Sequence, residues 1–149
     1  MSMPTHSGGY RIRNLGTNRY IALERGYVLP GQKAALKSYS QETTHSWLVE
    51  HVEDGIFRVR PFANAHWQIH LLAEMKPTDH RTNRILEVNN DTSFLWRIWD
   101  TPNRQGVFMS YYQERDQVAE ADPTTGNIML ANLNTVRDDT NQMWVLEVV

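Results

Sequence analysis

The chain has 149 residues, 40% of them hydrophobic and 21% charged, and this composition predicts a single globular domain, residues 1–149, with its own core. Its formal net charge is −2 at pH 7 with no block of like charges, which argues against a dedicated nucleic-acid or anionic-membrane surface. There is no cysteine, so disulfides, thiolate catalysis and cysteine-based zinc sites are excluded.

Short runs of β-branched and aromatic residues alternate with turn residues along almost the whole chain. Residues 1–8 are polar, and we expect a loose tail there. The stretch 66–75 also fits a short helix, but it occupies the place of a strand. The pattern predicts strands near residues 10–15, 19–23, 33–38, 46–52, 56–61, 66–72, 84–88, 94–99, 107–112, 117–121, 127–132 and 143–148. A long polar loop is expected at 76–83 and a tight turn at 122–126.

Three tryptophans, Trp47, Trp96 and Trp144, recur at intervals of roughly 50 residues, each inside an apolar strand. An aromatic strand opens each interval, at Tyr10, Phe57 and Phe108. The chain is therefore interpreted as three copies of one four-stranded unit. The predicted units are about residues 9–54, 55–105 and 106–149.

Twelve strands in three pseudo-symmetric units predict an all-β fold of the β-trefoil type, a six-stranded barrel capped by three hairpins. Three units are too few for a propeller, which typically needs four or more blades. Alternation predicts that Tyr10 and Ile12 face inward while Arg11 and Arg13 face outward. In the last strand it sets Trp144, Leu146 and Val148 against Val145, Glu147 and Val149.

The three repeated tryptophans are interpreted as core, because threefold-related positions meet on the axis of such a barrel. Trp67 and Trp99 have no counterparts in the other units, so either is a candidate for an exposed stacking platform.

The sequence contains no recognisable catalytic or metal-binding motif. On a strand, His66 and His70 would stand ~13 Å apart, too far to share one ion. No HExxH motif or phosphate-binding glycine loop occurs. We therefore expect no enzyme activity, no metal and no cofactor.

The start of the chain lacks the basic segment and apolar run of a secretory signal. No apolar stretch approaches the ~20 residues that cross a bilayer. The expectation is a cytoplasmic protein without membrane or nucleic-acid partners.

The loop between residues 23 and 33 is the most suggestive candidate for binding. Arg25 stands between Glu24 and Gly26, with Tyr27 next to them. A trypsin-like protease has a deep pocket that accepts an Arg or Lys side chain. A loop whose shape is fixed before binding avoids much of the ordering cost and binds without productive cleavage. The residues alone leave open the simpler alternative of a solvated arginine in a hairpin loop.

A family resemblance favours the interpretation of this loop as a protease-binding loop. The segments that carry it are Glu24-Arg25, Leu29-Pro30, Trp47-Leu48-Val49-Glu50 and Gly55. They resemble the cysteine-free β-trefoil trypsin inhibitors of mushrooms, of the cospin and cnispin type, most clearly over residues 9–60. The resemblance implies a trypsin-like serine protease as partner. It also implies that Arg25 enters the protease pocket while Glu24, Gly26 and Tyr27 hold the loop extended. In cnispin-like members the loop between the last two strands carries the basic residue, which here is Arg137.

A second resemblance supports the alternative function, carbohydrate binding. Ricin-B-type lectins close each repeat with Gln-x-Trp, and Gln142-Met143-Trp144 fits that pattern, whereas the corresponding tripeptides of the first two units do not. Those lectins bind sugar through an early Asp and an aromatic side chain. The third unit offers such residues, namely Asp116, Asp122, Tyr111 and Tyr112. An inhibitor of cysteine proteases or a defence toxin on the same scaffold is a further alternative.

Overall fold

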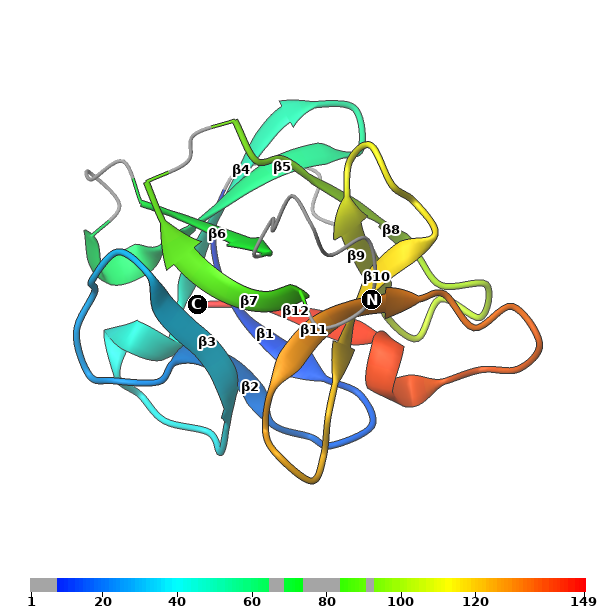
Figure 1. The fold of residues 1–149 in the computed structure, drawn as a ribbon, viewed down its shortest axis with the longest axis horizontal. Coiled ribbons are helices and arrows are strands. Elements are labelled where there is room, and N and C mark those ends of the chain that lie inside the picture. The colour runs from blue at the N-terminus through cyan, green and yellow to red at the C-terminus, as the bar shows by residue number, and fades with distance from the viewer. Residues whose placement is uncertain (1–7, 65–68, 74–83, 91–92) are drawn as a thin grey trace.

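The computed structural model describes residues 8–64, 69–73, 84–90 and 93–149, and twelve strands and three short 3-10 turns lie within them (Figure 1). The strands are β1 (Gly8–Asn14), β2 (Tyr20–Leu23), β3 (Gln32–Lys37), β4 (Trp47–Glu53), β5 (Ile56–Pro61), β6 (His70–Ala73), β7 (Arg84–Asn89), β8 (Trp96–Asp100), β9 (Val107–Tyr111), β10 (Gln117–Ala121), β11 (Ile128–Asn132) and β12 (Trp144–Val148). The turns are η1 (Thr43–His45), η2 (Phe62–Asn64) and η3 (Thr140–Gln142).

All twelve predicted strands are present, most of them within two residues of the predicted bounds. The largest difference is β6, which begins at His70 and not at residue 66. The long loop predicted at 76–83 lies outside the described residues, as do His66 and Trp67. No helix in the described part of the chain has the length and apolar character needed to cross a membrane.

Six of the strands close into a ring. The pairs run β1–β12, β12–β9, β9–β8, β8–β5, β5–β4 and back from β4 to β1, all antiparallel. Each strand of the ring therefore has a hydrogen-bonded neighbour on both sides, which removes the exposed edges that promote aggregation.

The other six strands form three hairpins, β2–β3, β6–β7 and β10–β11. The hairpins join one another where β3 pairs with β7 and β7 pairs with β11. A bridge between Ala35 and Asn127 connects the first hairpin to the third. Each hairpin thus contacts the other two around a common centre (Figure 1).

The repeated tryptophans lie in the core, as predicted, and each is 0% exposed. Each indole N–H donates to a backbone carbonyl in the first strand of the preceding hairpin, which is β2, β6 or β10. Each tryptophan therefore ties the ring to one hairpin. The bonds run from Trp47 to Ile21 (2.8 Å), from Trp96 to Leu71 (2.8 Å) and from Trp144 to Ala119 (3.0 Å).

Alternation along β1 is confirmed, because Tyr10 and Ile12 are buried while the side chains between them are only partly covered. In β12 Trp144 and Leu146 are buried, whereas Val148, predicted on the same face, is 78% exposed. Val145, predicted on the opposite face, is buried. Alternation decides where a side chain points, whereas burial also needs a neighbour that covers it.

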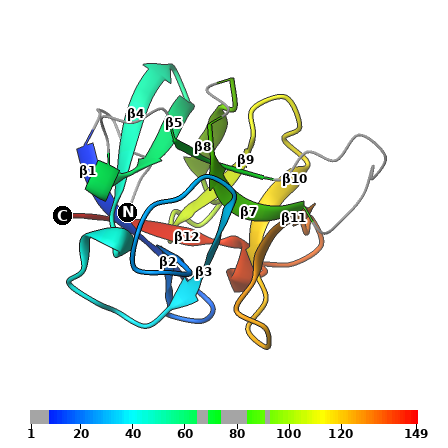
Figure 2. The same ribbon diagram turned by 60° about the vertical axis from the view of Figure 1, so that its left-hand side comes forward.

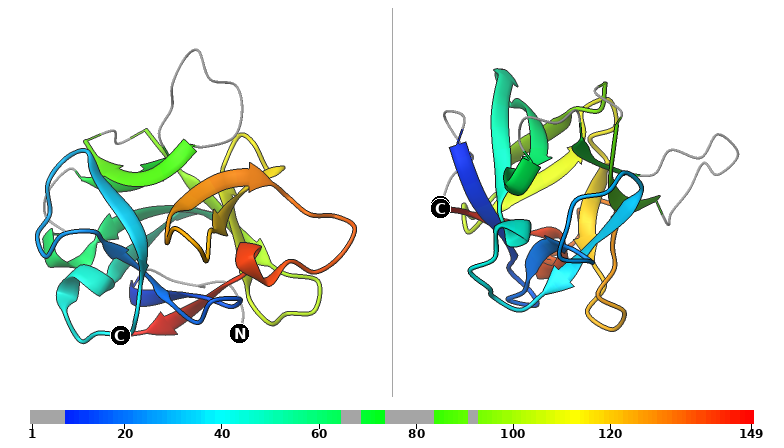
Figure 3. Two further views of the ribbon diagram at one scale, coloured as in Figure 1. Left: turned by 60° about the horizontal axis from the view of Figure 1, so that its bottom comes forward. Right: turned by 90° about the vertical axis from the view of Figure 1, so that its left-hand side faces the viewer.

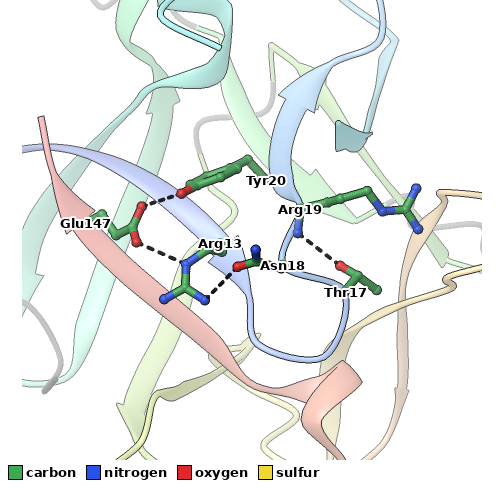
Figure 4. A network of polar contacts seen from close by, with 6 residues as sticks. All are labelled: Arg13, Thr17, Asn18, Arg19, Tyr20 and Glu147. Atoms are coloured by element: carbon green, nitrogen blue, oxygen red, sulfur yellow. Dashed lines mark hydrogen bonds and ion pairs between the residues drawn. The ribbon is translucent and has the colours of Figure 1, made fainter. Parts of the chain in front are cut away.

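A polar network on the outer face joins the first and last strands (Figure 4). The Glu147 carboxylate accepts from the Tyr20 hydroxyl at 2.7 Å and from Arg13 Nε at 3.0 Å. Arg13 also donates to Asn18 Oδ1 at 3.1 Å. Burial, followed by the bond to Glu147, raises the pKa of Tyr20. The ring is therefore closed between β1 and β12 by the Arg13–Glu147 ion pair as well as by the backbone hydrogen bonds of the two strands.

Candidate functional site

The loop between β2 and β3 carries Arg25 on its exposed side. Glu24, Arg25 and Gly26 are exposed, and Tyr27 is 49% exposed. Arg25 Nη1 donates to the Tyr27 hydroxyl at 3.2 Å, and this bond raises the pKa of the guanidinium above its ordinary value. Arg25 is therefore a permanently charged side chain at the surface. Figure 2 brings the loop to the front, where it arches between the two strands.

A buried glutamine supports this loop from below. Gln32 is 9% exposed and begins β3. Its Oε1 accepts from the Arg25 backbone N–H at 2.7 Å, and its Nε2 donates to the Tyr27 carbonyl at 2.5 Å. The backbone on both sides of Gly26 is thus bonded to one side chain.

Both ends of the loop are also anchored. The Glu24 backbone N–H donates to the Lys33 carbonyl at 3.0 Å, and the Gly31 N–H donates to the Val88 carbonyl of β7 at 2.7 Å. Gly31 has a φ of +82°, a conformation that glycine adopts without a steric cost. These contacts make the loop a defined structure between two fixed points.

The shape of the loop differs from the extended form expected from the sequence. The backbone bends at each of residues 24–27. The cause lies in the bonds just described, because a single amide group reaches both Arg25 N and Tyr27 O only if the chain curves around it. A hollow of about 330 Å³ lies beside the bend, lined by residues 24–25 and 29–33.

Arg137, the second candidate, lies in the loop between β11 and β12. This loop lies on the opposite side of the molecule from the loop between β2 and β3 (Figure 3). Arg137 is exposed, and its neighbour Val136 is 93% exposed. Asn134 Oδ1 accepts from the backbone N–H groups of both residues, at 3.1 Å for Val136 and 3.3 Å for Arg137. A groove of about 320 Å³ runs under this loop, lined by Pro102, Phe108, residues 133–138 and Met143.

Gln142, the glutamine of the Gln-x-Trp pattern, supports the Arg137 loop much as Gln32 supports the Arg25 loop. It is 2% exposed. Its Oε1 accepts from Asn134 N at 2.9 Å, and its Nε2 donates to the Asn132 carbonyl and to Glu120 Oε1, both at 2.8 Å. The geometry gives this glutamine a structural role.

The candidate sugar-binding residues divide between two places. Tyr111, Tyr112 and Asp116 lie together at the turn that joins β9 to β10, whereas Asp122 follows the far end of β10. The carboxylate of Asp122 accepts from the backbone N–H groups of Thr124 (2.9 Å) and Thr125 (3.3 Å). These bonds lower its pKa, so Asp122 is committed to its own turn.

The β9–β10 turn site, defined here as Tyr111, Tyr112, Gln113 and Asp116, carries aromatic and polar side chains on one turn. The two tyrosine rings are 5.4 Å apart and nearly perpendicular, at 81°. Tyr111 is half-buried against Phe94, with ring centroids 4.7 Å apart. Gln113 accepts from the Tyr111 hydroxyl at 3.4 Å and donates to the Tyr112 hydroxyl at 2.7 Å. Gln113 and Asp116 are exposed.

Backbone contacts hold this turn in place. Tyr112 N–H donates to the Leu95 carbonyl at 3.0 Å, and Leu133 N–H donates to the Asp116 carbonyl at 2.8 Å. An ion pair between Arg84 and Glu114, at 3.1 Å, ties the middle of the turn to β7. The site is therefore carried by a turn bonded to its neighbours on several sides.

Neither Trp99 nor the described histidines form a further candidate site. Trp99 is half-buried against Phe108, and the guanidinium of Arg115 lies 5.3 Å from its ring centroid, so this tryptophan is no open platform. His45, at the end of η1, is only 5% exposed. Within the described residues, no group of three or more His, Cys, Asp or Glu side chains is placed to hold a metal ion.

Comparison with known proteins establishes the fold. No protein-family model and no curated protein matches the sequence. A designed threefold-symmetric protein, ThreeFoil, matches with a TM-score of 0.79 at 12% identity, over 95% of this chain and 99% of its own. The Rhizoctonia solani agglutinin matches with a TM-score of 0.77 at 15% identity, over 100% of this chain and 99% of its own. The ricin B-like lectin of Macrolepiota procera, solved with lactose, matches with a TM-score of 0.77 at 16% identity, over 99% of each chain.

These structures are β-trefoil proteins, and the closed ring with its three hairpins agrees with them. At such low identity the likeness extends to the fold alone. The chain is therefore an all-β protein of twelve described strands with the β-trefoil fold.

Proposed function

We propose that this protein acts by binding carbohydrate, through the β9–β10 turn site. Two of the proteins with the same fold over their whole length are an agglutinin and a lectin solved with lactose. This support favours the glycan alternative over the protease inhibitor that the first resemblance implies.

The observation that carries the proposal is the grouping of chemical types at the turn. A sugar ring has an apolar face and a rim of hydroxyl groups, so its site needs an aromatic surface next to planar hydrogen-bonding groups. Tyr111 and Tyr112 supply the aromatic surface, and Gln113 and Asp116 supply an amide and a carboxylate. Asp122 is left out of this site because its carboxylate caps its own turn.

We also propose that the domain consists of three repeats, about residues 9–54, 55–105 and 106–149. The equivalent indole bonds of the three core tryptophans support this division. On that division the third repeat alone has an Asp where the lectin resemblance requires one, so we expect one sugar site per molecule.

A glycan array with the parent protein, followed by titration of the best ligand into variants, tests the sugar site. We expect binding that free sugar inhibits. Tyr112→Ala and Asp116→Asn should each weaken it about tenfold or more, which corresponds to ~1.4 kcal/mol. Asp122→Asn is the matched control and should bind like the parent. Binding that is unchanged in the first two variants would place the sugar elsewhere.

A second function, reversible inhibition of a trypsin-like serine protease, is favoured by the exposure of Arg25 on an anchored loop. The expected interface is of standard size, ~1,600 Å² in total. Neither function requires catalysis or a cofactor.

Titration of trypsin activity with the pure protein tests this second function. Arg25→Asn should remove most of the inhibition, because the charged group that fills the pocket is lost. Arg137→Asn, which changes an exposed arginine on the opposite side, should inhibit like the parent. Equal inhibition by the parent and Arg25→Asn would exclude this loop as the reactive site.

A further inference from the structure

We infer that Gln32 is the positioning residue of the Arg25 loop, and that its side-chain amide keeps the Arg25–Gly26 peptide bond from being cut. The inference rests on the second of the two proposed functions, since it concerns how a trypsin-like protease meets Arg25.

Gln32 stands where the strand pattern calls for an apolar side chain. It shares the buried face of β3 with Ala34 and Leu36. Burying an amide is unfavourable unless its donor and acceptor are both bonded. In Gln32 the amide oxygen and the amide nitrogen are both bonded, and both partners are backbone groups of the loop. The polar side chain at this core position therefore serves the loop.

The two bonds enclose a single residue. Arg25 gives its backbone N–H and Tyr27 gives its carbonyl, so the chain curves around the amide with Gly26 at the outside of the bend. Among the described residues, and leaving aside its two chain neighbours, no heavy atom lies within 4 Å of the point where a side chain on Gly26 would begin. The Gln32 amide therefore bonds the backbone on both sides of Gly26, and the Arg25 Nη1 bond to the Tyr27 hydroxyl at 3.2 Å is the other contact that spans this residue.

Hydrolysis of the Arg25–Gly26 bond requires a particular shape of the chain. A trypsin-like enzyme binds the segment around the bond as an extended strand, and one water adds across the bond to leave a carboxylate on Arg25 and an amino group on Gly26. The bend at residues 24–27 differs from that shape. Gln32 therefore lets Arg25 be presented while opposing the conformation in which the bond is cleaved.

The structure provides a matched control in Gln142. That glutamine is also buried, and it bonds the backbone of the Arg137 loop through Asn134 N and the Asn132 carbonyl. Gln142→Ala removes the same chemical group from the core and releases the other loop. Gln32→Glu is a finer change, because a carboxylate still accepts from Arg25 N–H but donates nothing to the Tyr27 carbonyl.

The experiment incubates the full-length parent and the three variants with trypsin and follows the cleavage sites by intact-mass spectrometry. We expect the parent to resist cleavage after Arg25. Gln32→Ala should be cut there at least about tenfold faster, with Gln32→Glu between the two and Gln142→Ala like the parent at this bond. Fast cleavage of the parent after Arg25, or equal rates in the parent and Gln32→Ala, would overturn the inference.

Cleavage after Arg137 in the same digest distinguishes a local effect of Gln32 on its loop from unfolding of the whole protein. If Gln32→Ala merely unfolds the protein, cleavage after Arg137 rises as much as cleavage after Arg25, and that result also overturns the inference. Inhibition of trypsin is measured separately. A parent that resists cleavage but does not inhibit refutes the second proposed function alone, whereas equal inhibition and equal resistance of Gln32→Ala refute the role of Gln32.

Discussion

Three buried amide side chains, those of Asn14, Gln32 and Gln142, each bond the backbone of a loop. The Gln-x-Trp pattern draws attention to position 142, whereas position 32 falls in the predicted loop, just before the strand expected at 33–38. The sequence does not reveal what these amides bond to, since their partners are loop backbone groups whose positions depend on the folded chain. A polar residue at an inward strand position is the signal that would have found Gln32.

His45 leads to a prediction about pH. Its Nδ1 is buried without a hydrogen-bond partner within the described structure, and burial, assisted by the charge of Lys37, lowers its pKa. Arg11 acts in the same direction and Glu42 opposes them. In the unfolded chain a histidine titrates near ~6.5, so acid is taken up first by the unfolded state. The free energy of unfolding should be fully retained above pH ~6.5 and fall as the pH drops through that value.

Urea unfolding at several pH values between about 7 and 5 measures this effect. His45→Gln should make the loss of stability with acid shallower. An unchanged slope in His45→Gln would show that other groups cause the acid sensitivity.

At the scale of elements, the strands follow from the sequence more completely than the loops do. All twelve strands were predicted because alternation and turn residues are local signals. The bend of residues 24–27 was not, because Gln32, eight residues after Glu24, imposes it. The division of the sugar candidates was also missed, since it depends on which end of β10 each Asp occupies.

Two glycines in connecting segments should respond differently to a methyl group. A Cβ on Gly106 would lie 2.5 Å from the carbonyl oxygen of Trp144, a backbone atom of β12 and not the end of a flexible side chain, so Gly106→Ala should destabilise the fold by ~1–3 kcal/mol. A Cβ on Gly26 would meet no atom of the described residues within 4 Å beyond its chain neighbours, so Gly26→Ala should leave stability unchanged or raise it by up to ~1 kcal/mol. Thermal unfolding of both variants decides the matter, and similar losses in both would contradict the packing described here.

For the molecule as a whole, closure of the ring was predictable because a period of roughly 50 residues implies repeated units that complete a common core. The match to structures of 12–16% identity shows how few residue identities this fold requires. The ligand was not predictable in the same way, because function depends on turns and loops that vary freely around a packed core.

The equivalence of the three core tryptophans is a prediction at this scale. Trp47→Phe, Trp96→Phe and Trp144→Phe each remove an indole N–H and leave a buried carbonyl without its donor. Each should lower the free energy of unfolding by ~1–3 kcal/mol for the lost bond, with a further loss for the smaller ring. Urea unfolding followed by circular dichroism measures all three. A variant as stable as the parent would show that its position is not equivalent to the others.

The most direct test of carbohydrate binding at the β9–β10 turn is an amide-resolved NMR titration of the full-length protein with the best glycan from the array. The account predicts that the largest shifts fall on residues 111–116 and saturate with a single site per molecule. Shifts that gather at another part of the surface, or a protein that binds no sugar on the array, would contradict it.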